Sequence, residues 1–115
     1  MSFTQRILYE PLRTADTASA GTYLVVGTPL AHPACLIKMV NRSNKDLLIS
    51  LDGVNPVDVC PADSFWLYDV TSNSPQTNNI FADQGRQYYV KTTDAAAGTG
   101  PVYLVVQYIQ TNLGV

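Results

Sequence analysis

Short runs of β-branched and aromatic residues, each closed by turn-forming residues, are the feature that most constrains how this chain can fold. Tyr, Val, Ile and Thr recur in stretches such as TYLVV, ACLIKMVN and RQYYVKT, with Gly, Pro, Asn and Asp between them. No window repeats its apolar residues at the three- and four-residue spacing of an amphipathic helix. The pattern therefore predicts strands and turns with almost no helix.

The runs predict about eight antiparallel strands at intervals of roughly 8–12 residues, which is the spacing of a β-sandwich or jelly roll. They are expected at residues 5–13 (interrupted by Pro11), 22–26, 34–41, 46–51, 56–60, 64–70, 86–92 and 101–110. The strand at 46–51 is expected to pair back on 34–41 as a hairpin, and residues 14–21 and 71–79 are expected to be loops. A chain of 115 residues has room for one domain, so we expect a single all-β sandwich or jelly roll over residues 1–115.

The first and last strands carry further expectations. Pro11 removes a backbone donor, so residues 1–13 are expected to be either an N-terminal arm, which could add to a neighbour's sheet, or an edge strand of this domain. Residues 101–110 form the longest predicted strand and are apolar on both faces. Such a strand is expected to be central in its sheet or covered by a neighbouring subunit.

A low charge content points toward an assembly component. Charged residues make up 14% of the chain, against roughly 25% in ordinary soluble domains. Part of the surface should therefore be apolar, which usually marks contacts with other subunits. With a net charge of −2 and no basic run, the sequence predicts no nucleic-acid partner. No apolar segment approaches the roughly 20 residues of a membrane span, and no secretory signal pattern is present, so synthesis in a cytosol is expected.

The residues that could support catalysis are few. His32 is the only histidine, lies in the loop GTPLAHP, and has no nucleophile motif to serve. Five aspartates fall at strand ends or turns, where hydrogen bonds from the side chain to the backbone are expected. They are Asp46, Asp52, Asp58, Asp63 and Asp69. The spacing of a calcium-binding loop is absent. With no nucleophile motif beside His32 either, the sequence predicts no catalytic residue, no metal site and no cofactor.

Two cysteines, Cys35 and Cys60, complete the inventory of reactive side chains. They are not part of a CxxC pair or a Cys/His cluster, so zinc binding is not expected. A disulfide would require their strands to be neighbours. The expected state is two buried thiols that pack as small apolar groups.

Seven tyrosines and one tryptophan are unusual in so short a chain. Such rings are favoured at interfaces because each combines an apolar body with a polar tip. In the segment SFWLYDV, Phe65 and Leu67 share one face, and Trp66 and Tyr68 share the other. Some rings must therefore lie outside the core, where they could contact another subunit or, as an alternative, form a carbohydrate-binding platform.

Two stretches resemble small virion proteins of tailed bacteriophages. They are NRSNKDLLISLDGVNPVDVCPADSFWLYDV, at residues 41–70, and QYYVKTTDAAAGTGPVYLVVQYI, at residues 87–109. The shared pattern begins with a strand ending in Asn, followed by an ISLDG-like strand and turn. A short stretch that ends in a proline and a small residue comes next, then an aromatic strand, and finally a YVKT…VYLVVQY ending. The two stretches cover a little under half of the chain and leave its N-terminal third unmatched.

Among such virion proteins, the chain is most similar to capsid decoration (cement) proteins. The resemblance implies a non-enzymatic jelly-roll protein on the capsid exterior, made in the host bacterial cytoplasm. Its partners would be the major capsid protein and, in a dimer or trimer, further copies of itself. A neck, head-fibre or tail component and a carbohydrate-binding jelly-roll module are the alternatives. The candidate subunit-interface residues are Phe3, Arg6, Ile7, Leu8, Tyr9, Tyr103 and Val105.

Overall fold

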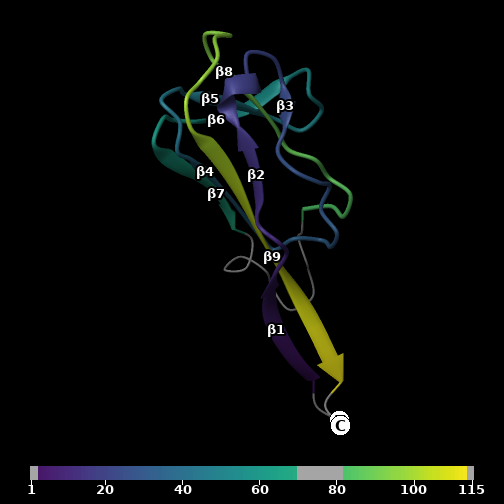
Figure 1. Ribbon diagram of the computed structural model, residues 1–115. Helices are drawn as coiled ribbons and strands as arrows, with labels where there is room; N and C mark the ends of the chain where they lie inside the picture. The colour runs from purple at the N-terminus through teal and green to yellow at the C-terminus, as the bar shows by residue number, and fades with distance from the viewer. Residues whose placement is uncertain (1–2, 70–81, 114–115) are drawn as a thin grey trace.

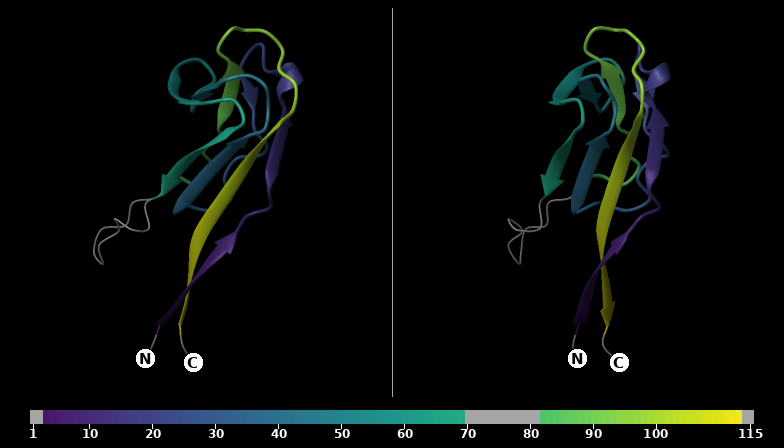
Figure 2. Two further views of the ribbon diagram at one scale, coloured as in Figure 1. Left: turned by 90° about the vertical axis from the view of Figure 1, so that its left-hand side faces the viewer. Right: turned by 60° about the vertical axis from the view of Figure 1, so that its left-hand side comes forward.

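Two antiparallel sheets pack face to face in the computed structural model, which describes residues 3–69 and 82–113 (Figures 1 and 2). The first sheet contains β1 (Phe3–Tyr9), β2 (Arg13–Asp16), β4 (Leu36–Asn41), β7 (Ser64–Asp69) and β9 (Pro101–Leu113). The second contains β3 (Leu24–Val25), β5 (Leu47–Ser50), β6 (Pro56–Cys60) and β8 (Tyr89–Thr92). The prediction of an all-β sandwich is confirmed.

The strand order explains how one chain builds both sheets. The first sheet has the order β1-β9-β4-β7, with β2 also paired to β9, and the second has the order β3-β8-β5-β6. β1 and β2 occupy successive stretches along the same side of β9, and Pro11 lies between them. β9 is therefore central in its sheet, as its two apolar faces predicted, and it is also the longest strand that the structure describes.

The predicted hairpin between residues 34–41 and 46–51 is wrong. β4 and β5 belong to different sheets, and the hairpin partner of β5 is β6. The chain crosses between the sheets after Asn41, whose buried side-chain NH₂ donates to the carbonyls of Lys45, Cys60 and Pro61 at 2.9–3.1 Å. Alternating apolar residues predict a strand but not the sheet it joins, so the sequence pattern could not reveal this crossing.

Other boundaries also differ from the prediction. The expected loop at 14–21 begins as β2 and continues as a short 3-10 turn, Thr17–Ser19, capped by the side chain of Asp16. Its small polar residues form a strand because they pair with residues 101–104 of β9. The predicted strands at 22–26 and 86–92 shorten to β3 and β8. The predicted loop at 71–79 lies outside the described residues.

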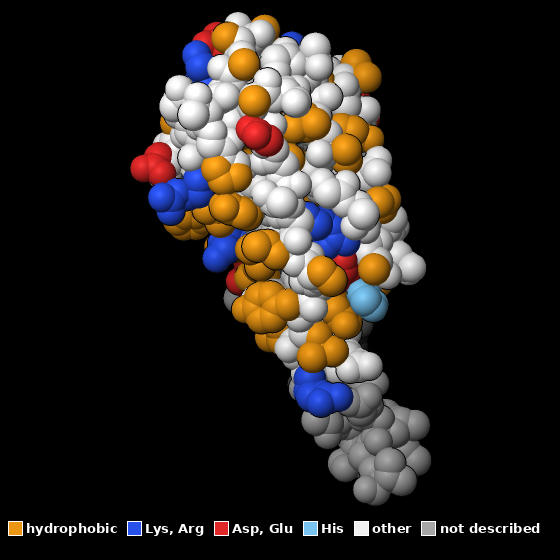
Figure 3. Space-filling view, viewed as in Figure 1, with side chains coloured by type: hydrophobic (Ala, Val, Ile, Leu, Met, Phe, Trp, Pro, Cys, Tyr) orange, Lys and Arg blue, Asp and Glu red, His pale blue; other side chains and the backbone are white. Residues whose placement is uncertain are grey.

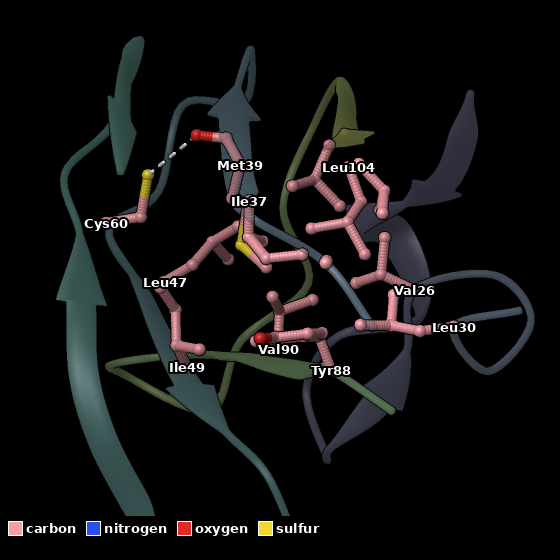
Figure 4. Packing of buried hydrophobic residues seen from close by; sticks show 13 residues of the cluster. Val26, Leu30, Ile37, Met39, Leu47, Ile49, Cys60, Tyr88, Val90 and Leu104 are labelled. Atoms are coloured by element: carbon pink, nitrogen blue, oxygen red, sulfur yellow. Dashed lines mark hydrogen bonds between the residues drawn. The ribbon is translucent and has the colours of Figure 1, made fainter. Parts of the chain in front are cut away.

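The core fills the space between the two sheets. Figure 4 shows side chains of both sheets pointing toward one another, with Ile37 and Met39 of β4 beside Leu47 and Ile49 of β5. All four are at most 1% exposed. Burial of one such side chain stabilises the fold by ~1.5–3 kcal/mol, so this cluster holds the sandwich together.

One part of the molecule extends beyond this core. β1 and residues 107–113 of β9 pair over their full length and leave the body as a two-stranded ribbon (Figures 1 and 2). The molecule is therefore elongated, with extents of 56 × 22 × 22 Å. We use "the ribbon" for β1 with residues 107–113, and "the body" for the two packed sheets.

Candidate interaction site

The outward side of the first sheet presents an apolar surface, which the strand register defines. Leu104 and Val106 of β9 are buried, so the alternating residues Tyr103 and Val105 face outward. On the same side of the sheet, Val40 of β4 lies between Tyr103 of β9 and Phe65 of β7. Lys38 of β4 lies in the same way between Val105 of β9 and Leu67 of β7. We call this surface the outer face; its apolar residues are Ile7, Tyr9, Leu36, Val40, Phe65, Leu67, Tyr103, Val105 and Ile109.

Several apolar side chains of the outer face are well exposed and lie next to one another in the register. Phe65 is 59% exposed and Leu67 is 48% exposed, although both lie in the middle of a strand. On the ribbon, Ile7 and Tyr9 are 54% and 65% exposed. Lys38 is the charge at the centre of the outer face. Contiguous exposed apolar patches of this kind mark sites of protein association.

A shallow depression lies at one end of the outer face. Lys38, Val40, Arg42, Asp63, Ser64 and Phe65 line it, and its volume is about 400 Å³. Arg42 and Asp63 form an exposed ion pair across it at 3.4 Å. Figure 3 shows hydrophobic side chains gathered in the lower half of the body, where it narrows toward the ribbon. Apolar surface with a few charges at its rim is the usual composition of a protein interface.

The predicted interface residues divide between the two sides of the ribbon. Ile7 and Tyr9 lie on the outer face with Tyr103 and Val105, while Arg6 and Leu8 point to the opposite side. Phe3 pairs with Leu113 at the end of the ribbon. The prediction did not include the outer-face residues of β4 and β7. The common orientation of Phe65 and Leu67 was the available signal, but the sequence does not show which side of a strand faces the core.

A polar cluster joins the ribbon to the body. Glu10 follows β1 and is the only glutamate of the chain; its side chain is 1% exposed. One carboxylate oxygen accepts from the Arg13 guanidinium at 2.7 Å and from the backbone N–H of Ala31 at 3.1 Å. The other lies 2.9 Å from Nδ1 of His32 and accepts from that residue's backbone N–H at 2.8 Å. The ring of His32 stacks on Tyr108 of β9 with centroids 3.7 Å apart.

Arg13 extends the same cluster into the loop after β3. Its guanidinium donates to the carbonyls of Thr28 and Pro29 at 2.7 and 2.9 Å. Gly27 adopts a φ of +73°, and a Cβ there would lie 2.6 Å from the Arg13 side chain. Glycine is therefore required both for the backbone conformation and for the close approach of Arg13.

The hydrogen bonds around Glu10 decide its ionisation. Burial acts to raise the pKa of Glu10, but donation from Ala31, His32 and Arg13 outweighs it and lowers the pKa below its usual value. The carboxylate is therefore charged at neutral pH and stabilises the junction of ribbon and body. Sequence analysis missed Glu10, because its partner His32 is 22 residues away in the chain.

No catalytic arrangement forms around His32 in the part of the chain that the structure describes. Its partners are Glu10 and Tyr108, and neither is a nucleophile activated by a base. The expected bonds from aspartate side chains to the backbone are confirmed at Asp46 and Asp52. Donation from Asn55, from Val54 and from Ser50 holds the pKa of Asp52 well below its usual range and fixes the turn between β5 and β6. Among the described residues, no group of His, Cys, Asp and Glu could hold a metal ion.

Both cysteines are free and buried, as predicted. Burial raises the pKa of Cys35, and it raises the pKa of Cys60 to about 11. Protonated, enclosed thiols are poor nucleophiles, so neither cysteine is a reactive site in the folded protein.

No protein-family model, curated protein or solved structure matches this chain. No helix in the described residues is long and apolar enough to cross a membrane.

Proposed function

We propose that this chain is a non-enzymatic structural subunit that binds a larger protein surface through its outer face. The observation that carries the proposal is the exposure of apolar side chains in the middle of β7, where Phe65 and Leu67 contact no second layer among the described residues. A sheet face with this composition is normally covered. The described part of the chain has no third layer of secondary structure that could cover it.

The long side of the molecule is large enough for a stable contact. With extents of 56 × 22 × 22 Å, one long side of the molecule exceeds the ~800 Å² per partner of a standard interface. Lys38 lies within this surface, Arg42 and Asp63 lie at one end of it, and the register places Asp69 at the other end of β7. Binding would therefore depend mainly on burial of apolar area and only weakly on salt.

The resemblance of residues 41–70 and 87–109 to tailed-phage virion proteins favours one assembly. In that assembly the chain decorates the capsid exterior, binds the major capsid protein, and associates with further copies of itself. Many copies, each with a modest interface, would together stabilise the head against internal pressure.

We also infer that the connectivity is that of a jelly roll, and nested strand pairs support this inference. β5 pairs with β6, β4 with β7, β3 with β8, and β1 and β2 with β9, all antiparallel. These are the pairs of one long hairpin with its tip at β5 and β6. Wrapping this hairpin brings β9 beside β4 and β8 beside β5, which are the two remaining pairs.

The test uses purified virions of the phage that produces the chain. We expect the protein in these particles at a copy number of the same order as the major capsid protein, and retention in about 1 M salt. Phe65→Lys should release it, while the matched control Val57→Lys, on the exposed side of β6, should leave it bound. Absence from virions would overturn the virion role, a few copies per particle would indicate a neck or tail position, and release by salt would contradict an apolar interface.

A further inference from the structure

The ribbon has an open backbone edge. The N–H of Glu10 donates to the carbonyl of Val106 at 3.0 Å, and β1 continues this register toward its start. Bonded and non-bonded pairs alternate along an antiparallel ladder, so the next bonded residue of β1 is Leu8. The N–H and C=O groups of Ile7 and Tyr9 therefore point away from β9, to a side where no strand lies among the described residues.

The edges at β3 and β6 are protected in ways that β1 is not. β3 has only two residues, and β6 begins at Pro56 and carries Asp58. At β7, the indole N–H of Trp66 donates to Asp58 at 2.6 Å and links the two sheets at that side. β1, in contrast, has seven residues, no proline and a single charge, Arg6. A long, nearly uncharged edge strand is a template for pairing with another strand.

We propose that β1 pairs antiparallel with β1 of a second copy of this chain, so that the two ribbons join into one wider sheet. The proposal rests on the homo-oligomer of the proposed function and names the strand through which it forms. A two-stranded ribbon is marginally stable in water, whereas additional strands with an apolar face give independent stability. Two identical strands that pair antiparallel are related by a two-fold axis, which is the commonest symmetry of protein dimers.

The charge of Arg6 disfavours one register. A two-fold axis at Arg6 would place both guanidinium side chains directly opposite each other, which is unfavourable. An axis at Ile7 instead places Arg6 opposite Leu8 of the second copy. Each Ile7 then exchanges both backbone bonds with its equivalent, and its side chain, 54% exposed in the single chain, gains an identical apolar neighbour on the outer face.

The backbone geometry supplies a matched pair of variants. Proline at position 7 removes an N–H that points to the open edge, and proline is tolerated where that N–H faces solvent, so pairing of β1 with β9 is kept. Ile7→Thr keeps the N–H and a β-branched side chain. In sedimentation analysis of the full chain, we expect dimers for the wild type and Ile7→Thr, and for Ile7→Pro a dissociation constant raised about tenfold or more. A monomeric wild type, or a dimer unaffected by Ile7→Pro, would overturn the proposal.

A distance measurement tests the same geometry without disturbing β1. In the proposed dimer, the two Gln110 backbones are separated by three strand spacings, so spin labels on Gln110→Cys should lie within about 30 Å of each other. Labels on Ala97→Cys, in the loop at the opposite end of the molecule (Figures 1 and 2), should be farther apart than the 56 Å length of one chain. A dimer with close Ala97 labels and distant Gln110 labels would contradict pairing through β1. It would leave binding of a larger surface by the outer face intact, so the two proposals can fail separately.

Discussion

The body and the ribbon use the same strand in two different ways. In the body, residues 102–104 of β9 lie between β2 and β4, and the inward side chains Val102, Leu104 and Val106 are at most 1% exposed. Residues 107–113 continue the ladder with β1, where on the same side of the strands Leu8 and Tyr108 are only half-buried and Arg6 and Gln110 are exposed. Backbone pairing is continuous, but side-chain burial is not. The comparison teaches that packing between the sheets holds the fold, while the ribbon pairs through its backbone with no second layer among the described residues.

Removing a core side chain should have the largest effect on stability. Leu104→Ala deletes methyl groups that are almost fully buried between the sheets, and we expect a loss of about 3 kcal/mol in the free energy of unfolding. Ile7→Ala, its counterpart on the ribbon, should cost the monomer less than about 1 kcal/mol, because its side chain is half exposed. Urea denaturation followed by Trp66 fluorescence measures both values.

Equal losses for these two variants would break the comparison. They would mean that the ribbon already shares the cooperative core of the body. Denaturation at several protein concentrations provides the control, because pairing through β1 would make the cost of Ile7→Ala depend on concentration while the cost of Leu104→Ala would change little.

Sequence reasoning predicted the body better than it predicted the junction. The apolar runs at 34–41 and 101–110 indicated strands because both are rich in β-branched and other apolar residues, which favour a strand where one side of the sheet is buried. The strand at Arg13–Asp16 was missed because small polar residues become a strand there only by pairing with β9. Glu10 and His32 come together through a loop whose path depends on tertiary contacts. No local sequence pattern therefore predicts that these two residues are in contact.

The junction itself should respond next most strongly to mutation. Glu10→Gln keeps the shape of the side chain but removes the charge that Arg13 and His32 contact, so we expect a loss of about 2 kcal/mol at pH 7. The pKa of Glu10 is lowered in the folded protein, so its stabilising contribution is present above the unfolded pKa and is lost as pH falls through the folded value. The difference between wild type and variant should therefore shrink below about pH 4.

Denaturation of both proteins between pH 7 and pH 3 measures this difference. Thr14→Val serves as a control, because Thr14 is exposed on the neighbouring strand β2 and makes no contact with Glu10 that the structure shows. A constant gap between wild type and Glu10→Gln across this range would contradict a stabilising charge at Glu10.

The smallest effect concerns the order in which the two thiols become accessible. Cys35 lies next to the junction, with its N–H bonded to the carbonyl of Gln107 at 2.9 Å, whereas Cys60 is fully buried within the body and has its pKa raised to about 11. Since a protonated, enclosed thiol reacts only after local opening, labelling rates report where the fold opens. At pH 8 we expect slow modification of both thiols, with Cys35 reacting several-fold faster, as followed by mass spectrometry of Cys35→Ala and Cys60→Ala variants.

Glu10→Gln should accelerate labelling of Cys35 and leave that of Cys60 nearly unchanged. If both thiols accelerated equally, the junction would open only with the whole body, and ribbon and body would be one cooperative unit.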